Sequence, residues 1–192
     1  MGGRLPPPEP ACRVGQGGVV AYAVEMFFDE RADEAVRGLW RRLASAGLSS
    51  LETYGHARNR PHVSLSVMDA VPDVAAIGEV QRLPPLLFPA LGMFAGDGGV
   101  LFLAPVVTPP LLAVHERVWQ SLQGQGHAQW AQYGPGRWVP HCTLAMGLPP
   151  AGLAAAAGLL AGFHPVEARV TELGVTDTRT GKVTVLSSWG SP

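Results

Sequence analysis

The sequence is poor in charged residues, and the few it has are balanced in sign. Charged side chains make up 15% of the 192 residues, with 14 Lys and Arg against 15 Asp and Glu. This composition excludes a long basic surface of the kind that wraps duplex nucleic acid. It is compatible with a site that binds one phosphate or one strand end.

Cysteine is scarce, and long apolar segments are missing. Cys12 and Cys142 are too few for a disulfide framework and lack metal-ligand spacing, so we expect a protein of the reducing cytoplasm. The first ten residues contain no apolar segment, and position 6 is Pro where a myristoylation signal needs Ser or Thr. We therefore expect no signal peptide and no lipid anchor. The most apolar stretch, residues 152–163, is too short to span a bilayer, so no membrane association is predicted.

Hydrophobic residues make up 47% of the chain, which predicts a packed domain. Residues 1–18 are rich in Pro and Gly without periodicity and are predicted to be a disordered N-terminal lead-in. Residues 19–192 are predicted to form a single domain.

Hydrophobic periodicity and turn signals divide this domain into two similar halves. The first half is predicted to contain strand 19–29, a helix capped by Asp29 that ends at Gly47, strands 51–54 and 62–68, helix 72–82 and a hairpin of 86–94 with 100–103. The second half is predicted to contain a helix from Pro110 to about residue 122, loop 124–137, strand 138–146, helix 150–163 and a hairpin of 166–175 with 183–186. Leu91-Gly92 and Leu173-Gly174 each lie 8 residues before a glycine, counted from the leucine. The matching order of helix, strand, helix and hairpin indicates an internal duplication.

Each half contains the pattern Pro-His-x-[Ser/Thr]-Leu, at residues 61–65 and 140–144. Because residues i and i+2 of a strand lie on one face, His62 is predicted to project beside Ser64, and His141 beside Thr143. A single such histidine would more often be a buried strand residue satisfied by a hydroxyl. The matched pair, at equivalent places in two repeats, favours a functional site.

This repeated motif resembles that of the two-histidine phosphoesterase superfamily, specifically the family of 2′-5′ RNA ligases and RNA 2′,3′-cyclic phosphodiesterases. The resemblance covers roughly residues 19–190. It implies an α+β fold with two pseudo-symmetric lobes, antiparallel sheets lining a central cleft and helices on the outside. The one departure is Ser64, where the family more often has Thr; both supply a hydroxyl. Family convention implies that His62 donates and His141 accepts the proton during hydrolysis, an assignment that the residues alone leave open.

The residue types suit the opening of a 2′,3′-cyclic phosphate. One imidazole can deprotonate the attacking water and the other can protonate the departing ribose oxygen, near neutral pH. The hydroxyls of Ser64 and Thr143 are predicted to donate hydrogen bonds to the non-bridging phosphate oxygens. No third His, Cys or carboxylate stands at ligand spacing, so neither a metal nor another cofactor is expected.

Three arginines and one tyrosine are weaker candidates for substrate binding. Arg58 and Arg60 precede His62, and Arg137 precedes His141, at even offsets that place them on the catalytic face if the strands extend that far. The alternative is a solvated arginine in a loop. Tyr133 lies in the Gly- and Gln-rich loop with His127 and Trp130, where an aromatic ring either stacks on a base or anchors the loop, the latter being favoured. Trp138, at an odd offset, is predicted to face the core. His56 is expected to be exposed, His115 and His164 to be structural, and Cys142 to be a buried, inert thiol.

The sequence therefore predicts a monomeric, metal-independent phosphodiesterase that acts on the 2′,3′-cyclic phosphate ends of RNA or small nucleotides and leaves a 2′-phosphate. Reverse 2′-5′ ligation is expected to be minor because water is abundant. No obligate protein partner is implied. The alternatives are a phosphoesterase for a non-RNA cyclic nucleotide, a catalytically idle module that binds RNA ends, and a purely structural duplicated domain.

Overall fold

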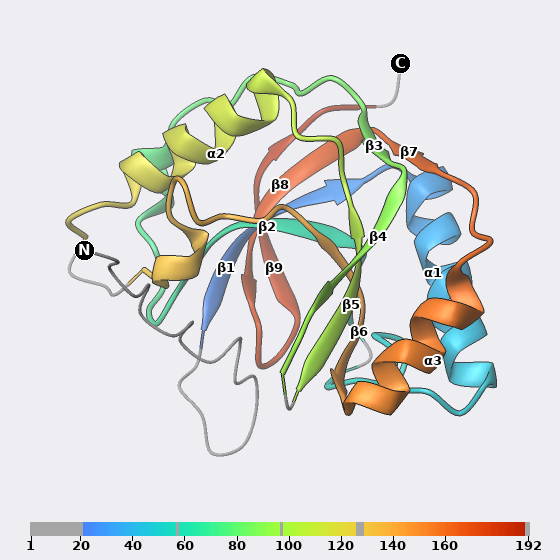
Figure 1. Ribbon diagram of the computed structural model, residues 1–192. Helices are drawn as coiled ribbons and strands as arrows, with labels where there is room; N and C mark the ends of the chain where they lie inside the picture. Colours follow the sequence, from blue (N-terminus) through green and yellow to red (C-terminus); the bar gives the residue numbers. More distant parts are fainter. Residues whose placement is uncertain (1–20, 57, 97, 126–128, 191–192) are drawn as a thin grey trace, which may run out of the picture.

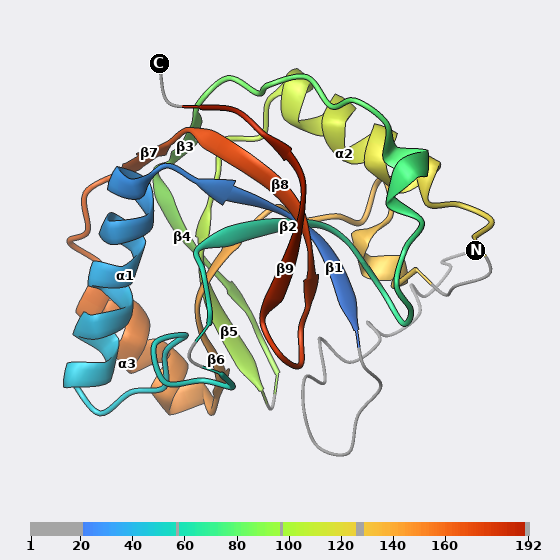
Figure 2. The same cartoon turned by 180° about the vertical axis from the view of Figure 1, so that it is seen from behind.

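Antiparallel sheets form the centre of this α+β fold, and the helices lie on their outer sides (Figures 1 and 2). The computed structural model describes residues 21–56, 58–96, 98–125 and 129–190. The predicted lead-in, residues 1–18, lies outside these ranges, as does His127. Among the residues described, no helix is long and apolar enough to cross a bilayer.

The largest sheet has the strand order β2-β1-β8-β9 and combines segments from both ends of the chain. Its strands are β1 (Tyr22–Phe28), β2 (His62–Met68), β8 (Val170–Asp177) and β9 (Lys182–Ser188). A second sheet has the order β4-β5-β6, with β4 (Ala90–Phe94), β5 (Gly99–Ala104) and β6 (Cys142–Leu148). A short pair joins β3 (Leu86–Phe88) to β7 (Val166–Ala168). Each hairpin thus pairs with a strand of the other half of the chain: β5 pairs with β6, and β8 pairs with β1, next to β2.

Helix α1 (Glu30–Ser45) and helix α3 (Pro150–Leu160) lie together on one side, and α2 (Pro109–Ser121) lies on the other (Figures 1 and 2). The predicted N-cap of α1 is confirmed, because the Asp29 side chain accepts a hydrogen bond from the backbone N–H of Ala32 at 3.0 Å. Thr108 caps α2 in the same way. Helix α1 packs against β6 and β7, α3 against β5 and β6, and α2 against β2.

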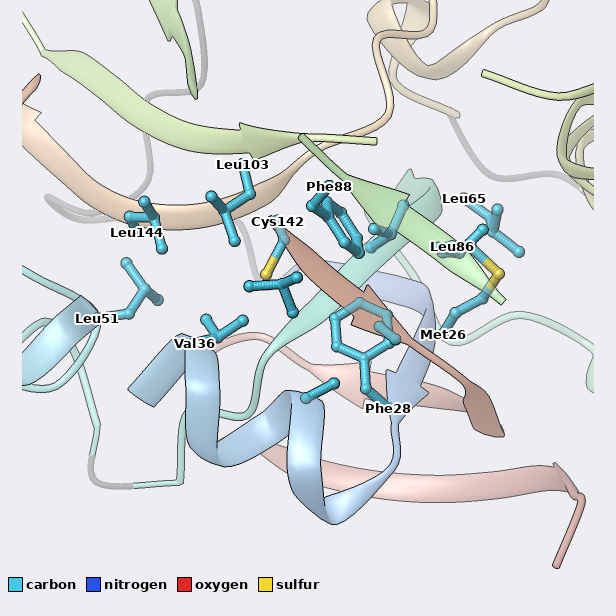
Figure 3. Packing of buried hydrophobic residues seen from close by; sticks show 14 of the residues in the cluster. Met26, Phe28, Val36, Leu51, Leu65, Leu86, Phe88, Leu103, Cys142 and Leu144 are labelled. Atoms are coloured by element: carbon cyan, nitrogen blue, oxygen red, sulfur yellow. The ribbon is translucent and has the colours of Figure 1, made fainter. Parts of the chain in front are cut away.

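The main core lies between α1 and the sheets, and it includes the apolar faces of both motif strands. Figure 3 shows the thiol of Cys142 pointing in among Val36, Leu103 and Leu144. All four side chains are buried. Burial of this kind contributes roughly 1.5–3 kcal/mol for each large apolar side chain.

Several predicted boundaries are wrong. Residues 51–54 form turns instead of a strand. The predicted helix 72–82 is reduced to the 3₁₀ helix η1 (Val74–Ile77), which ends at Gly78 with φ 63°. The predicted strand 138–146 begins only at Cys142. The first strand of each predicted hairpin is interrupted, at Pro89 in one and at Arg169 in the other. The residues before each break, β3 and β7, pair with each other instead.

Candidate functional site

The two motifs open strands β2 and β6 with the predicted alternation. His62 and Ser64 are half-buried while Val63 and Leu65 are buried, and His141 and Thr143 are half-buried while Cys142 and Leu144 are buried. The proline before each histidine is buried at the strand entrance, where no ladder hydrogen bond is lost. The alternation therefore places each histidine and its hydroxyl residue on the same, more accessible face.

Both motifs also contain a β-bulge at the same place, which the sequence analysis did not foresee. A register shift leaves Leu65, directly after Ser64, without a pairing partner in β1. The corresponding shift leaves Leu144, directly after Thr143, without a pairing partner in β5. Bulges bend a strand and redirect its side chains, and they are common beside active sites. The backbone is therefore distorted in the same way in both motifs.

Each bulge is tied to the other half of the chain by a tryptophan. The indole N–H of Trp138 donates to the backbone carbonyl of Ser64 at 2.9 Å. The indole N–H of Trp40, on α1, donates to the backbone carbonyl of Thr143 at 3.0 Å. These hydrogen bonds satisfy carbonyls next to the distorted ladder and fix one motif against the segment that carries the other. Trp138 packs against the core, as predicted.

The two imidazoles are oriented identically by their own backbone. Nδ1 of His62 lies 2.6 Å from the carbonyl oxygen of Arg60, and Nδ1 of His141 lies 2.7 Å from that of Val139. A carbonyl only accepts hydrogen bonds, so Nδ1 carries the proton in both rings. Nε2 is then the atom that each ring presents for proton transfer.

The motifs lie close to each other in space. Strands β2 and β6 are in contact, although they belong to different sheets. The backbone N–H of His62 interacts with the buried Cys142 thiol and opposes the rise in the pKa of that thiol. The pKa of His141 lies below its usual value, first because of burial, with the hydrogen bond to Val139 opposing and the charge of His62 lowering it further. The last effect requires the two rings to be within electrostatic range.

A buried carboxylate next to His62 was missed by the sequence analysis. Glu25, on β1, is only 4% exposed, and its Oε1 lies 3.2 Å from Nε2 of His62. Ser64 Oγ donates to Oε1 at 3.2 Å, and Thr176 Oγ1 donates to Oε2 at 2.5 Å. The available signal was a single acid inside the apolar strand Tyr22–Phe28, since buried Glu is rare unless it is paired.

His141 has apolar surroundings instead. Its ring lies 5.0 Å from that of Phe94 and 5.2 Å from that of Phe102, measured between ring centroids. Within the described residues, its Nε2 has no hydrogen-bond partner. A lowered pKa keeps this ring neutral at neutral pH, with the Nε2 lone pair available to accept a proton.

The three arginines lie outside the two motif strands. Strand β2 begins at His62 and β6 at Cys142, so the alternation does not reach Arg58, Arg60 or Arg137. Arg60 forms an ion pair with Glu172 at 2.7 Å, and its guanidinium stacks 4.1 Å from the centroid of the Phe27 ring. Arg58 and Arg137 are exposed. Of the three, only Arg60 is held next to the histidine face.

Tyr133 and Trp130 pack against Ala21, Ala23 and Val67, at one end of the sheet that carries His62. The loop is anchored there, because the backbone N–H of Trp130 donates to the carbonyl of Val67 at 2.9 Å. This contact agrees with the favoured interpretation of the aromatic residues as anchors.

His115 and Cys142 match their predicted roles, and His164 is exposed. His115 is structural: it is buried, donates from Nε2 to the Tyr133 carbonyl at 2.7 Å and stacks on Trp138 at 3.9 Å. Its pKa is lowered, chiefly by burial. Burial raises the pKa of the Cys142 thiol to about 12, so this thiol is not a nucleophile. His56 was expected to be exposed but is half-buried against Gly181.

No three His, Cys, Asp or Glu side chains of the described ranges come together as a metal-ligand group. The site is an arrangement of proton-transfer groups. Two imidazoles present Nε2, one beside a carboxylate and one beside aromatic rings. Such a pair can act as acid and base on one substrate.

Comparison with known proteins gives one family and a structural likeness. The sequence model of the 2′-5′ RNA ligase superfamily matches residues 27–182. Two solved structures of Usb1 from Kluyveromyces marxianus are similar, one of them with uridine monophosphate; each has a TM-score of 0.49 and covers 88% of this chain and 98% of its own. Their sequence identities are 13% and 11%. No curated protein matches the sequence.

Proposed function

The chain belongs to the 2′-5′ RNA ligase superfamily, and we propose that it is a metal-independent phosphodiesterase that opens 2′,3′-cyclic phosphates to 2′-phosphates. The substrates are the 3′ ends of RNA or small nucleotides. The observation that carries the proposal is the pair of identically held imidazoles, His62 and His141, each with Nδ1 bound to a backbone carbonyl. A purely structural histidine pair does not need two rings that both present Nε2.

We expect the two halves to be pseudo-symmetric lobes that face each other across a cleft. A duplication is supported by the equivalent pairing of Glu25 and Phe102 with their neighbouring strands. Glu25 pairs with Ser64 on one side and Gly174 on the other, while Phe102 pairs with Thr143 and Gly92. The two glycines are those of the Leu-Gly repeats, so the sequence similarity and the register agree.

In the proposed reaction, a water molecule gives a proton to Nε2 of His141 as its oxygen attacks phosphorus. The bond from phosphorus to the ribose 3′ oxygen breaks, and that oxygen takes the proton from Nε2 of His62. The products are a 2′-phosphate and a 3′-hydroxyl. A 5′-hydroxyl that attacks in place of water would break the same bond and leave a 2′-5′ linkage and a 3′-hydroxyl. In-line attack requires the base and the acid on opposite sides of the phosphorus, an arrangement that two facing lobes supply.

The polar groups around the rings support this division of labour. Thr143 is expected to donate its hydroxyl to a non-bridging oxygen, while Ser64 reaches the phosphate only by leaving Glu25. Arg60, held by Glu172 and Phe27, is the best placed of the arginines to attract the substrate anion. Arg58, Arg137 and Tyr133 remain weaker candidates.

The test is incubation of the purified protein with the four 2′,3′-cyclic nucleotides in EDTA, with products resolved as 2′- or 3′-monophosphates. Turnover to the 2′ isomer is expected with all metal chelated, since two imidazoles supply both proton transfers. Absence of turnover with any cyclic nucleotide, together with binding of RNA ends, would favour the idle binding module instead. Exclusive formation of the 3′ isomer would contradict the proposed bond cleavage.

A further inference from the structure

Resting on the proposed phosphodiesterase activity, we propose that Glu25 is the positioning residue that makes the two histidines unequal. It holds the proton on Nε2 of His62, which makes His62 the acid, and it withdraws the Ser64 hydroxyl from phosphate binding. Thr143 is then the hydroxyl that holds the phosphate.

The first support is the hydrogen-bonding of the His62 ring. Nδ1 faces the carbonyl oxygen of Arg60 at 2.6 Å, and Nε2 faces Oε1 of Glu25 at 3.2 Å. Both partners are acceptors, so both nitrogens are satisfied only when each carries a hydrogen. That doubly protonated ring is the form of His62 that can give a proton to the leaving oxygen.

The second support is the isolation of Glu25. Its side chain is buried, and in the described part of the chain His62 is the only basic group paired with it. A buried carboxylate with no positive partner is strongly unfavourable. Arg60, two residues before His62, is paired with Glu172 instead. His62 is therefore the group that offsets the charge of Glu25.

The third support is the strand register, in which Glu25 and Phe102 occupy equivalent positions beside the two motifs. Glu25 pairs with Ser64 on β2, and Phe102 occupies the corresponding place beside Thr143 on β6. Ser64 donates its hydroxyl to Glu25, whereas the Thr143 hydroxyl has no hydrogen-bond partner among the described residues. One half thus uses this position for an acid, and the other uses it for a ring that packs on His141.

Thr176, on β8, holds the second carboxylate oxygen of Glu25. Its hydroxyl donates to Oε2 at 2.5 Å, while Oε1 receives Ser64, so both carboxylate oxygens are fixed. Fixing both oxygens aims Oε1 at the His62 ring. Thr176 and Ser64 therefore act through Glu25.

Four ionisable or charged groups surround His62. Glu25 faces it from β1, and Arg60 lies two residues before it, ahead of β2. Glu172, on β8, is paired with Arg60, and His141, directly before β6, interacts with His62 electrostatically. Replacing Glu25 by Gln changes one of these charges and leaves the other three in place. The shift that it causes in a pH–rate profile can therefore be assigned to the carboxylate.

The experiment compares Glu25→Gln with the wild type, using 2′,3′-cyclic AMP for kinetics and inorganic phosphate as the binding probe. We expect kcat to fall about 10²-fold, as for loss of a positioned acid, and the alkaline limb of the kcat profile to move to lower pH. Binding of phosphate is expected to stay as tight as in the wild type or to become tighter, because a negative charge is removed. Glu167→Gln, on the exposed face of β7, is the matched control and should match the wild type.

The two hydroxyls separate the roles further. Thr143→Ala is expected to weaken phosphate binding about tenfold, whereas Ser64→Ala should lower kcat without weakening phosphate binding. The double variant of Glu25→Gln with Ser64→Ala should be no slower than Glu25→Gln alone, since both changes disable one unit. If Glu25→Gln does not fold, Thr176→Val tests the same unit, and it should lower kcat and move the alkaline limb in the same direction.

Three results would overturn the inference. One is a folded Glu25→Gln protein with wild-type kcat and an unmoved alkaline limb. Another is a loss of phosphate binding in Glu25→Gln that parallels the loss of kcat, because this would indicate a merely structural role. The third is a wild-type protein inactive on every cyclic nucleotide, which would overturn the proposed function and the inference together. In the first two cases wild-type turnover persists, so the proposed function would stand.

Discussion

Gly92 is the position where a single methyl group should disturb the site most directly. It lies on β4 opposite Phe102, and a Cβ added to it would stand 2.2 and 2.5 Å from two carbons of the Phe102 ring. Carbon atoms pack best at about 3.5–4.0 Å. The ring must therefore move by roughly 1.3 Å or more to make room, on that contact distance.

The displaced ring has little free space. Phe102 is 4% exposed, and its ring centroid lies 4.5 Å from that of Phe94 and 5.2 Å from that of His141. Overpacking of this kind typically costs about 1–3 kcal/mol of the free energy of unfolding. A shift of about 1 Å in a catalytic group can cost up to about 10²-fold in rate, so we expect Gly92→Ala to lower kcat/KM by about 10–10²-fold.

Urea unfolding and turnover of a cyclic nucleotide measure the two effects. The control is Gly158→Ala on α3, where an added Cβ meets nothing within 4 Å. That change should stabilise the protein by about 0.5–1 kcal/mol and leave the activity unchanged. Adding Phe102→Leu to Gly92→Ala should restore part of the stability. A Gly92→Ala protein with wild-type stability and activity would refute the packing argument.

Three further predictions concern the surroundings of the motifs. In a Cys12→Ser background, the Cys142 thiol should not react with an aromatic disulfide reagent at pH 8 until the protein is unfolded, because its pKa is about 12; fast reaction of the folded protein would contradict this. Burial lowers the pKa of His141 below the ordinary imidazole value of about 6.5, so the acid limb of the kcat/KM profile should have its midpoint below about pH 6.5. A midpoint above about pH 6.5 would be inconsistent with His141 as the base. Trp138→Phe should cost about 1–3 kcal/mol in urea unfolding by leaving a carbonyl without its donor, and Trp189→Phe should cost less; equal losses would show that the hydrogen bond is unimportant.

The features predicted correctly from the sequence are those set by local periodicity. The alternation of His62 and Ser64 with buried neighbours follows from the two-residue repeat of a strand, and the cap at Asp29 follows from its place before an apolar stripe. The wrong strand at 51–54 has a tertiary cause. The backbone N–H of Leu51 donates to Leu144 as a single hydrogen bond, and the chain turns immediately after it.

The features that were missed depend on residues far apart in the sequence. Glu25 meets Ser64 only because β1 pairs with β2 in one particular register, and Trp40 reaches Thr143 across 103 positions. A carboxylate in an apolar strand was the only local trace of the former. The bulges have no sequence signature here, because the extra residue in each is an ordinary core leucine.

The central claim is that two imidazoles carry the chemistry, and its most direct measurement is turnover of a 2′,3′-cyclic nucleotide by His62→Ala, by His141→Ala and by the double variant. Each single change should cost roughly 10²–10⁴-fold, and the double variant should lose less than the product of the two because the pair acts as a unit. Circular dichroism and thermal unfolding confirm that each variant is folded. A folded double variant that kept wild-type turnover would contradict the account.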